Sequence, residues 1–146
     1  MSDSHTRTPI TVTHAGGLRF AADIRSHRVI TDQSAAAGGG DSAPSPIELL
    51  SAALGSCVAL YVHQFCVSRG LADGGMRIEV LPHHLANPSR IGGFDVTVHL
   101  REALPAHAME MLERVVRSCP AHNTLAHGAA ISVSIESSAT AHANAG

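Results

Sequence analysis

The chain has 146 residues, the size of one domain or of one subunit in an intertwined oligomer. Hydrophobic residues make up 45% of it and charged residues 15%, which is enough apolar material for a folded core. The formal net charge is -2 and no run of Lys or Arg is present. This composition argues against nucleic-acid binding, because displacing counterions from phosphates requires clustered positive charge.

From the sequence we expect neither a secretory signal nor a membrane segment. The first ten residues, MSDSHTRTPI, lack the apolar segment of a secretory signal. The longest apolar stretch, residues 57–62, is much shorter than the roughly 20 residues that span a bilayer. Three cysteines in such a chain argue against a structural disulfide framework. We expect a cytoplasmic protein with no membrane segment, forming one domain over residues 1–146, with residues 1–8 and 138–146 flexible.

The N-terminal third predicts short strands followed by a loop. Alternating side chains predict strands at residues 10–14, 18–24 and 27–31. Residues 35–45 are rich in Ala, Gly, Ser and Pro, which predicts a mobile loop.

A long helix follows this loop. Ser45, Pro46 and Glu48 have the spacing of a capping box with proline at the first helical position. No proline interrupts the chain from there to Gly70, so we predict a helix over residues 46–69, about 36 Å long. Its middle is apolar on every side, which indicates burial all round. Because so small a chain can hardly surround such a helix, the pattern also predicts a dimer.

The remaining segments complete an α+β pattern. They predict strands at residues 76–82 and 94–100, joined by a long connection at 87–93. After these strands we expect a helix from Pro105 to just before Cys119, a helical turn at 123–127 and a final strand at 129–136. No βαβ unit repeats, so the sheets are expected to be mainly antiparallel.

Cys57 lies about three turns into the long helix, and two interpretations of it stay open. Free cysteine is often a buried core residue. However, small side chains surround Cys57, and Gly55 costs a helix about 1 kcal/mol relative to alanine. This cost suggests that a backbone or a ligand passes close to Gly55 and that Cys57 is reactive.

The other two cysteines differ in position. Cys119 precedes Pro120 at a helix end, where free N–H groups favour a thiolate, although a helix-stop cysteine without chemistry is the alternative. Cys66 follows Cys57 by nine residues and faces nearly the opposite side of the helix at about 100° per residue, so we place it in the core. His63 with Cys66, and the pair His83 and His84, lack the paired spacing of zinc sites. We expect neither a metal nor a cofactor.

Two motifs resemble those of a known family. Residues 38–57 read GGGDSAPSPIELLSAALGSC, and residues 118–125 read SCPAHNTL. In this order they resemble the reactive-cysteine and second-cysteine segments of the osmotically inducible protein C and organic hydroperoxide resistance (OsmC/Ohr) family, closest to its general OsmC-like branch. The similar order of elements extends the resemblance from about residue 10 to residue 136.

The resemblance implies an intertwined homodimer with the long central helices packed back to back and a site at each interface. It implies a thiol-dependent peroxidase that reduces organic hydroperoxides, with Cys57 as the peroxidatic and Cys119 as the resolving residue. A sulfenic acid on Cys57 would condense with Cys119 to a disulfide, which requires Cα atoms within about 7 Å. An external, lipoyl-like dithiol would then reduce the disulfide.

An activating cation is also expected, because Cys57 lies too far from the helix N-terminus for the helix dipole to act on it. The resemblance points to an arginine held by a glutamate. Arg28 is the first candidate and Arg25 the second; Glu48 is the carboxylate candidate, although the capping box already explains it.

Two further classes of function stay open from the sequence. A dimer of the same fold could sense oxidants or bind a small apolar ligand without turnover, or Cys57 could be purely structural. An apolar wall of Leu50, Leu54 and Tyr61 around Cys57 favours lipophilic peroxides if the protein is an enzyme. A depressed pKa of Cys57 and multiple turnovers with a dithiol would distinguish the enzyme from the binder.

Overall fold

The computed structural model describes residues 8–71 and 75–137 and confirms the α+β class with antiparallel sheets. In chain order the elements are β1 (Thr11–His14), β2 (Phe20–Ile24), β3 (His27–Thr31), the 3₁₀ turn η1 (Ala35–Ala37), α1 (Pro46–Ser68), β4 (Arg77–Ala86), β5 (Ser89–His99), α2 (Ala106–Arg117) and α3 (Pro120–His127). The termini predicted to be flexible lie outside the described residues, except for residue 8.

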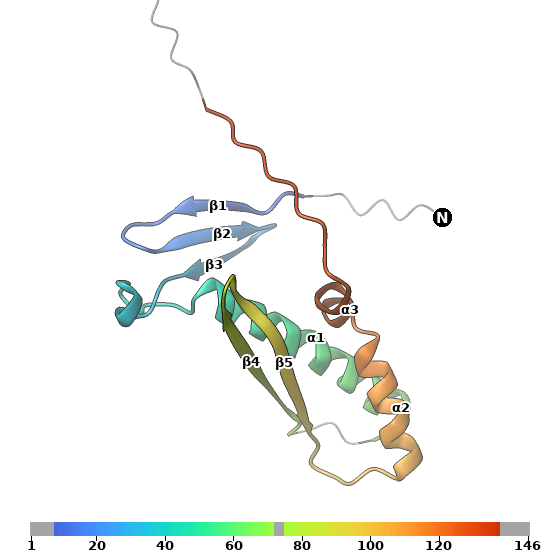
Figure 1. Cartoon of the computed structure of the whole chain (residues 1–146). Coiled ribbons are helices and arrows are strands. Elements are labelled where there is room, and N and C mark those ends of the chain that lie inside the picture. The colour runs from blue at the N-terminus through green and yellow to red at the C-terminus, as the bar shows by residue number, and fades with distance from the viewer. Residues whose placement is uncertain (1–7, 72–74, 138–146) are drawn as a thin grey trace, which may run out of the picture.

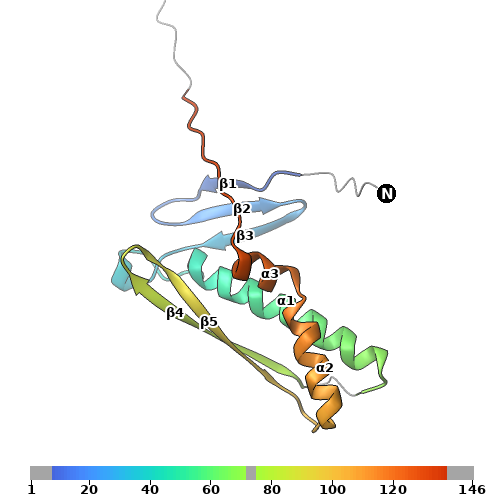
Figure 2. The ribbon, with the colours of Figure 1, turned by 45° about the vertical axis from the view of Figure 1, so that its right-hand side comes forward.

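Two separate antiparallel sheets flank the long helix. Strands β1, β2 and β3 form one sheet in sequence order, and β4 and β5 form a two-stranded hairpin. The hairpin runs alongside α1, whereas the three-stranded sheet lies beyond the N-terminal end of α1 (Figures 1 and 2). This outlying sheet leaves Val12, Phe20 and Ile30 exposed.

The start of α1 is the predicted capping box. Ser45 Oγ accepts a hydrogen bond from the N–H of Glu48 at 3.3 Å, and the Glu48 carboxylate accepts one from the N–H of Ser45 at 2.7 Å. Each bond satisfies an N–H group that the first helical turn leaves without an intrahelical partner.

The middle of α1 packs closely against the hairpin. A Cβ added at Gly55 would lie 3.0 Å from Val80 Cγ2 of β4, so the close approach predicted at this glycine is confirmed. The core centres on α1, with Val58 and Val62 almost completely buried between the hairpin and the two later helices. The close contact of Gly55 with Val80 fixes the rotation of the helix and therefore the direction in which Cys57 points.

Burial of α1 on every side is not found within this chain. Leu60 is 51% exposed and Val67 is 59% exposed, because the hairpin and the helices α2 and α3 cover only part of the surface of α1. By length and composition α1 could cross a membrane, but here it is the central helix of a packed α+β domain.

The hairpin differs from its prediction. The expected connection at residues 87–93 is wrong, since Ala86 pairs with Ser89 and the turn is only Asn87-Pro88, with a cis peptide bond. The glycines at 92 and 93 belong to β5 instead of to a turn. A Cβ at Gly92 would overlap the side chain of Leu85 on β4, so this glycine permits close cross-strand packing.

The C-terminal segment also differs. Helix α3 begins at Pro120, earlier than the predicted turn at 123–127. The strand predicted at residues 129–136 is not formed, because no strand within the described residues pairs with it. Ile131, Val133 and Ile135 are consequently 87%, 80% and 93% exposed.

A buried carboxylate orders the loop that was predicted to be mobile. Asp32 is 1% exposed, and its oxygens accept hydrogen bonds from the N–H of Gln33 at 2.8 Å and from the N–H and Oγ of Ser42 at 3.0 and 2.7 Å. Gly39 lies against the carbonyl oxygen of Gln33 with no room for a Cβ. The loop between β3 and α1 is therefore closed on itself around Asp32.

Acid should open this loop. The hydrogen bonds from Ser42, followed by those from Gln33, lower the pKa of Asp32 from 3.8 to about 2. Because the folded pKa lies below the unfolded one, the stabilisation is complete above about pH 4 and is lost as the pH falls through 2. We expect Asp32→Asn to flatten this dependence of the urea unfolding midpoint, while Asp41→Asn, an exposed control in the same loop, should keep it. Equal profiles for Asp32→Asn and wild type would contradict this role.

Candidate active site

Helix α1 places Cys57 at the edge of the core. Its side chain is half-buried and packs against the cluster that includes Leu54 and Val58. Ser56, its neighbour on the exposed side, bonds back to the carbonyl of Ala52 at 2.8 Å. Cys57 is therefore held on a rigid helix but is not sealed from solvent.

The turn between α2 and α3 places Cys119. Cys119 is the N-cap of α3, with Pro120 at the first helical position, and its Sγ accepts a hydrogen bond from the N–H of His122 at 3.3 Å. The predicted position at a helix terminus is confirmed. The side chain is nevertheless fully buried, at 0% exposure.

The two cysteines of the sequence motifs interact with each other. Burial raises the pKa of the Cys119 thiol, the N–H of His122 lowers it by a smaller amount, and a hydrogen bond and the charge of Cys57 raise it further. The expected acidity of Cys119 is therefore wrong, because desolvation of a thiolate outweighs the helix-terminal N–H. The structure has both thiols free, next to each other.

The third cysteine lies elsewhere. Cys66 is 1% exposed in the core, two and a half turns further along α1, which agrees with its predicted place. No cluster of three or more metal-ligating side chains occurs within residues 8–71 and 75–137.

An apolar cleft of about 640 Å³ opens beside the cysteine pair. Leu50 and Leu54 of α1 form one wall, Phe94 of β5 another, and His122 and Leu125 of α3 a third. Leu54 is one turn before Cys57, and His122 is one turn after Cys119, so residues close to both thiols line this cleft, although neither cysteine is part of its lining. Tyr61, the third residue of the predicted apolar wall, packs in the core instead.

Arg28 does not contact either cysteine within the described chain. It lies on β3 and is 65% exposed, and its guanidinium binds the Asp23 carboxylate at 2.7 and 3.1 Å. The hydrogen bonds that Arg28 donates to Asp23 raise the pKa of Arg28 and lower the pKa of Asp23.

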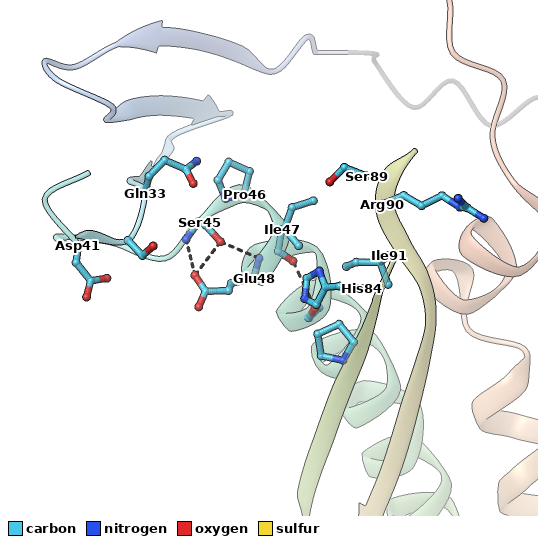
Figure 3. A pocket seen from close by; sticks show the side chains of 13 residues that line it. Gln33, Asp41, Ser45, Pro46, Ile47, Glu48, His84, Ser89, Arg90 and Ile91 are labelled. Atoms are coloured by element: carbon cyan, nitrogen blue, oxygen red, sulfur yellow. Dashed lines mark hydrogen bonds between the residues drawn. The ribbon is translucent and has the colours of Figure 1, made fainter. Parts of the chain in front are cut away.

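Glu48 faces a different hollow, a cavity of about 470 Å³ lined largely by polar side chains (Figure 3). Its carboxylate turns toward Ser45, whose N–H and hydroxyl donate to it and lower its pKa. Arg90 lines both this cavity and the apolar cleft, and its side chain extends away from Glu48. No arginine–glutamate pair therefore forms here within the described residues.

Two residues at the apolar cleft had no predicted role. Arg90 lies in the segment that was interpreted as a connection. Recognising Asn87-Pro88 as a complete hairpin turn would have placed Arg90 on β5. His122 is part of the motif SCPAHNTL, and its spacing of three from an N-cap cysteine was the available signal.

A family model described as OsmC-like protein matches residues 38–134, about two thirds of the chain. This protein belongs to the OsmC-like family. No curated protein matches the sequence.

Solved structures share the fold. A protein from Psychrobacter arcticus described as osmotic stress induced and detoxification response protein is 24% identical, with a TM-score of 0.73 over 80% of this chain and 87% of that one. An OsmC-like protein from Mycoplasma pneumoniae is 16% identical, with a TM-score of 0.71 over 84% and 89%. An organic hydroperoxide resistance protein OsmC from Legionella pneumophila is 15% identical, with a TM-score of 0.57 over 82% and 90%.

The interaction of the two thiols can be tested by titration. Because Cys57 raises the pKa of Cys119, we expect Cys57→Ala to make Cys119 more acidic. Thiolate absorbance at 240 nm in a Cys66→Ala background would follow Cys119 alone once Cys57 is removed. When Cys57 is present, the pKa of Cys119 would be obtained from the pH dependence of its alkylation rate, with the alkylated Cys119 peptide quantified by mass spectrometry. An unchanged or higher pKa in the variant would show that the thiols do not interact.

Proposed function

We propose that this protein is a thiol-dependent peroxidase that reduces organic hydroperoxides, with Cys57 as the peroxidatic and Cys119 as the resolving residue. The observation that carries the proposal is the adjacency of these two free thiols beside an apolar cleft. Membership of the OsmC-like family, with its links to organic hydroperoxide resistance, supports the same reaction. The roles of Arg28 and Glu48 stay predictions.

The chemistry uses the different environments of the two sulfurs. Half-buried Cys57 is accessible and attacks the distal oxygen of the hydroperoxide, which leaves an alcohol and a sulfenic acid. Buried Cys119, with its raised pKa, remains a thiol until that sulfenic acid forms beside it. Attack by Cys119 then releases water and forms the disulfide, which an external dithiol reduces by exchange.

The lining of the cleft supports lipophilic substrates. Leu50, Leu54 and Phe94 can receive the organic group of a hydroperoxide, whereas hydrogen peroxide would leave this apolar surface in water. The proposed location of the reaction is the cytoplasm, where dithiol reductants are available.

The working unit is proposed to be a homodimer. Leu60 and Val67 on α1, and the alternating Ile131, Val133 and Ile135, are apolar side chains that a single chain leaves in water. A second copy could cover the exposed side of α1 and pair with the extended segment at residues 129–136. Large exposed apolar surface of this kind is what obligate dimers bury.

Turnover with an organic hydroperoxide and a dithiol tests the enzymatic role. We expect wild type to turn over repeatedly and Cys57→Ser to lose at least about 1,000-fold in rate, because covalent catalysis loses its nucleophile. Cys119→Ser should react once and stall with Cys57 at the sulfenic acid or beyond. Absence of wild-type turnover would move the function to oxidant sensing or ligand binding.

Sedimentation of paired variants tests the dimer. We expect the wild-type protein to sediment as a dimer and the variant with Asp at positions 131 and 133 to sediment as a monomer, because the added charges cannot be buried at an interface. The matched control places Asp at Ser132 and Ser134, on the alternate side of the same segment. A monomeric wild type, or equal behaviour of both variants, would contradict the proposal.

A further inference from the structure

His122 is an ionisable residue at the apolar cleft, next to the buried thiol in the chain. Its backbone N–H donates to Cys119 Sγ at 3.3 Å, and His122 lines the cleft together with Leu54 and Phe94. The ring is half-buried, and no hydrogen bond or ion pair occupies it within the described residues. His127, the other histidine of α3, is exposed and its Nδ1 lies 2.9 Å from the Asn123 carbonyl.

The proposed reaction needs protons at two moments. An alkoxide leaves when Cys57 attacks a hydroperoxide, and a free alkoxide is a poor leaving group in an apolar cleft. Cys119 must later lose its proton in a buried position that disfavours the thiolate. An imidazole can supply the first proton and accept the second, since its ordinary pKa lies near neutrality.

We propose that His122 is a catalytic proton carrier of this site, an inference that rests on the peroxidase function proposed above. Cys57 reacts as the thiolate, with its own proton released to solvent, while the His122 ring carries a proton. The Cys57 sulfur then bonds the distal peroxide oxygen, the O–O bond breaks, and the imidazolium proton passes to the departing alkoxide. Sulfur is oxidised to the sulfenic acid, and the hydroperoxide is reduced to the alcohol.

The second step closes the proton balance. The neutral ring of His122 takes the proton of Cys119, whose thiolate attacks the Cys57 sulfur. The S–O bond breaks, and the departing hydroxide receives that proton and leaves as water. Two thiols and one hydroperoxide thus become a disulfide, an alcohol and water, with the electrons supplied by the two sulfurs.

Other ionisable groups line the two hollows that His122 borders. Arg90 of β5 lines the cleft on one side, and Glu113 and Arg117 of α2 line a second hollow of about 600 Å³ on the other side. The reacting thiols of Cys57 and Cys119 are ionisable as well. Because several of these groups are ionisable, the test below compares leaving groups at fixed pH.

The experiment is single-turnover oxidation of the reduced protein by two oxidants. Cumene hydroperoxide releases an alkoxide that needs a proton, whereas peracetic acid releases acetate, which does not. We expect His122→Gln to slow the first reaction about 100-fold and the second less than about threefold. His127→Gln should leave both rates at wild-type values. Dimedone trapping should also find a longer-lived Cys57 sulfenic acid in His122→Gln.

The ratio of the two rates separates the outcomes. Misfolding of His122→Gln, or a purely structural role, would lower both rates equally and overturn the inference, as would wild-type rates with both oxidants. Failure of the peroxidase function itself looks different, because neither oxidant would then oxidise Cys57 in the wild-type protein at a rate above that of a free thiol.

Discussion

The position of α1 against the β4–β5 hairpin is the constraint on which the site depends. Gly55 allows Val80 to come within 3.0 Å of where a Cβ would lie, and this contact sets both the depth and the rotation of the helix. With this contact fixed, Leu54, Val58 and Val62 of α1 pack into the core that α2 and α3 complete. Cys57 therefore faces the turn that carries Cys119. A larger side chain at position 55 would rotate or lift the helix and separate the thiols.

Two opposing effects act on Cys119, and their balance suits a resolving thiol. As the N-cap of α3 it receives the N–H of His122, which stabilises a thiolate. Complete burial destabilises the same thiolate by more, so the pKa rises. A permanently ionised Cys119 would itself compete for peroxide. A neutral, buried thiol instead reacts only when a sulfenic acid forms beside it, while Cys57 is the partly exposed thiol of the pair.

Local signals in the sequence were enough to predict much of the fold. The capping box of Ser45 and Glu48 located the start of α1, and Pro120 located the end of α2, because both depend on neighbouring residues only. The strand at residues 129–136 depends on a pairing partner that this chain does not provide. The hairpin was misjudged because Gly92 and Gly93 resemble a turn, although both lie in β5 and Gly92 makes room for Leu85 across the strands.

The site was predictable only where a motif marked it. Cys57 and Cys119 stand 62 positions apart, and their resemblance to known segments paired them before the fold did. Arg28 illustrates the opposite case, since a lone arginine in a strand gave no sign that Asp23 across the β2–β3 pair would bind it. The place of His122 at the cleft could not be predicted from the sequence, because its three-residue spacing from Cys119 is equally typical of a helix cap.

Peptide mapping after a single oxidation tests the central claim most directly. The reduced protein would receive one equivalent of an organic hydroperoxide, be alkylated without reductant, and be digested. The account predicts a Cys57–Cys119 cross-link in most molecules, with Cys66 alkylated once the protein is unfolded. Cys57 found as sulfinic acid, or cross-linked to any cysteine other than Cys119, would contradict it.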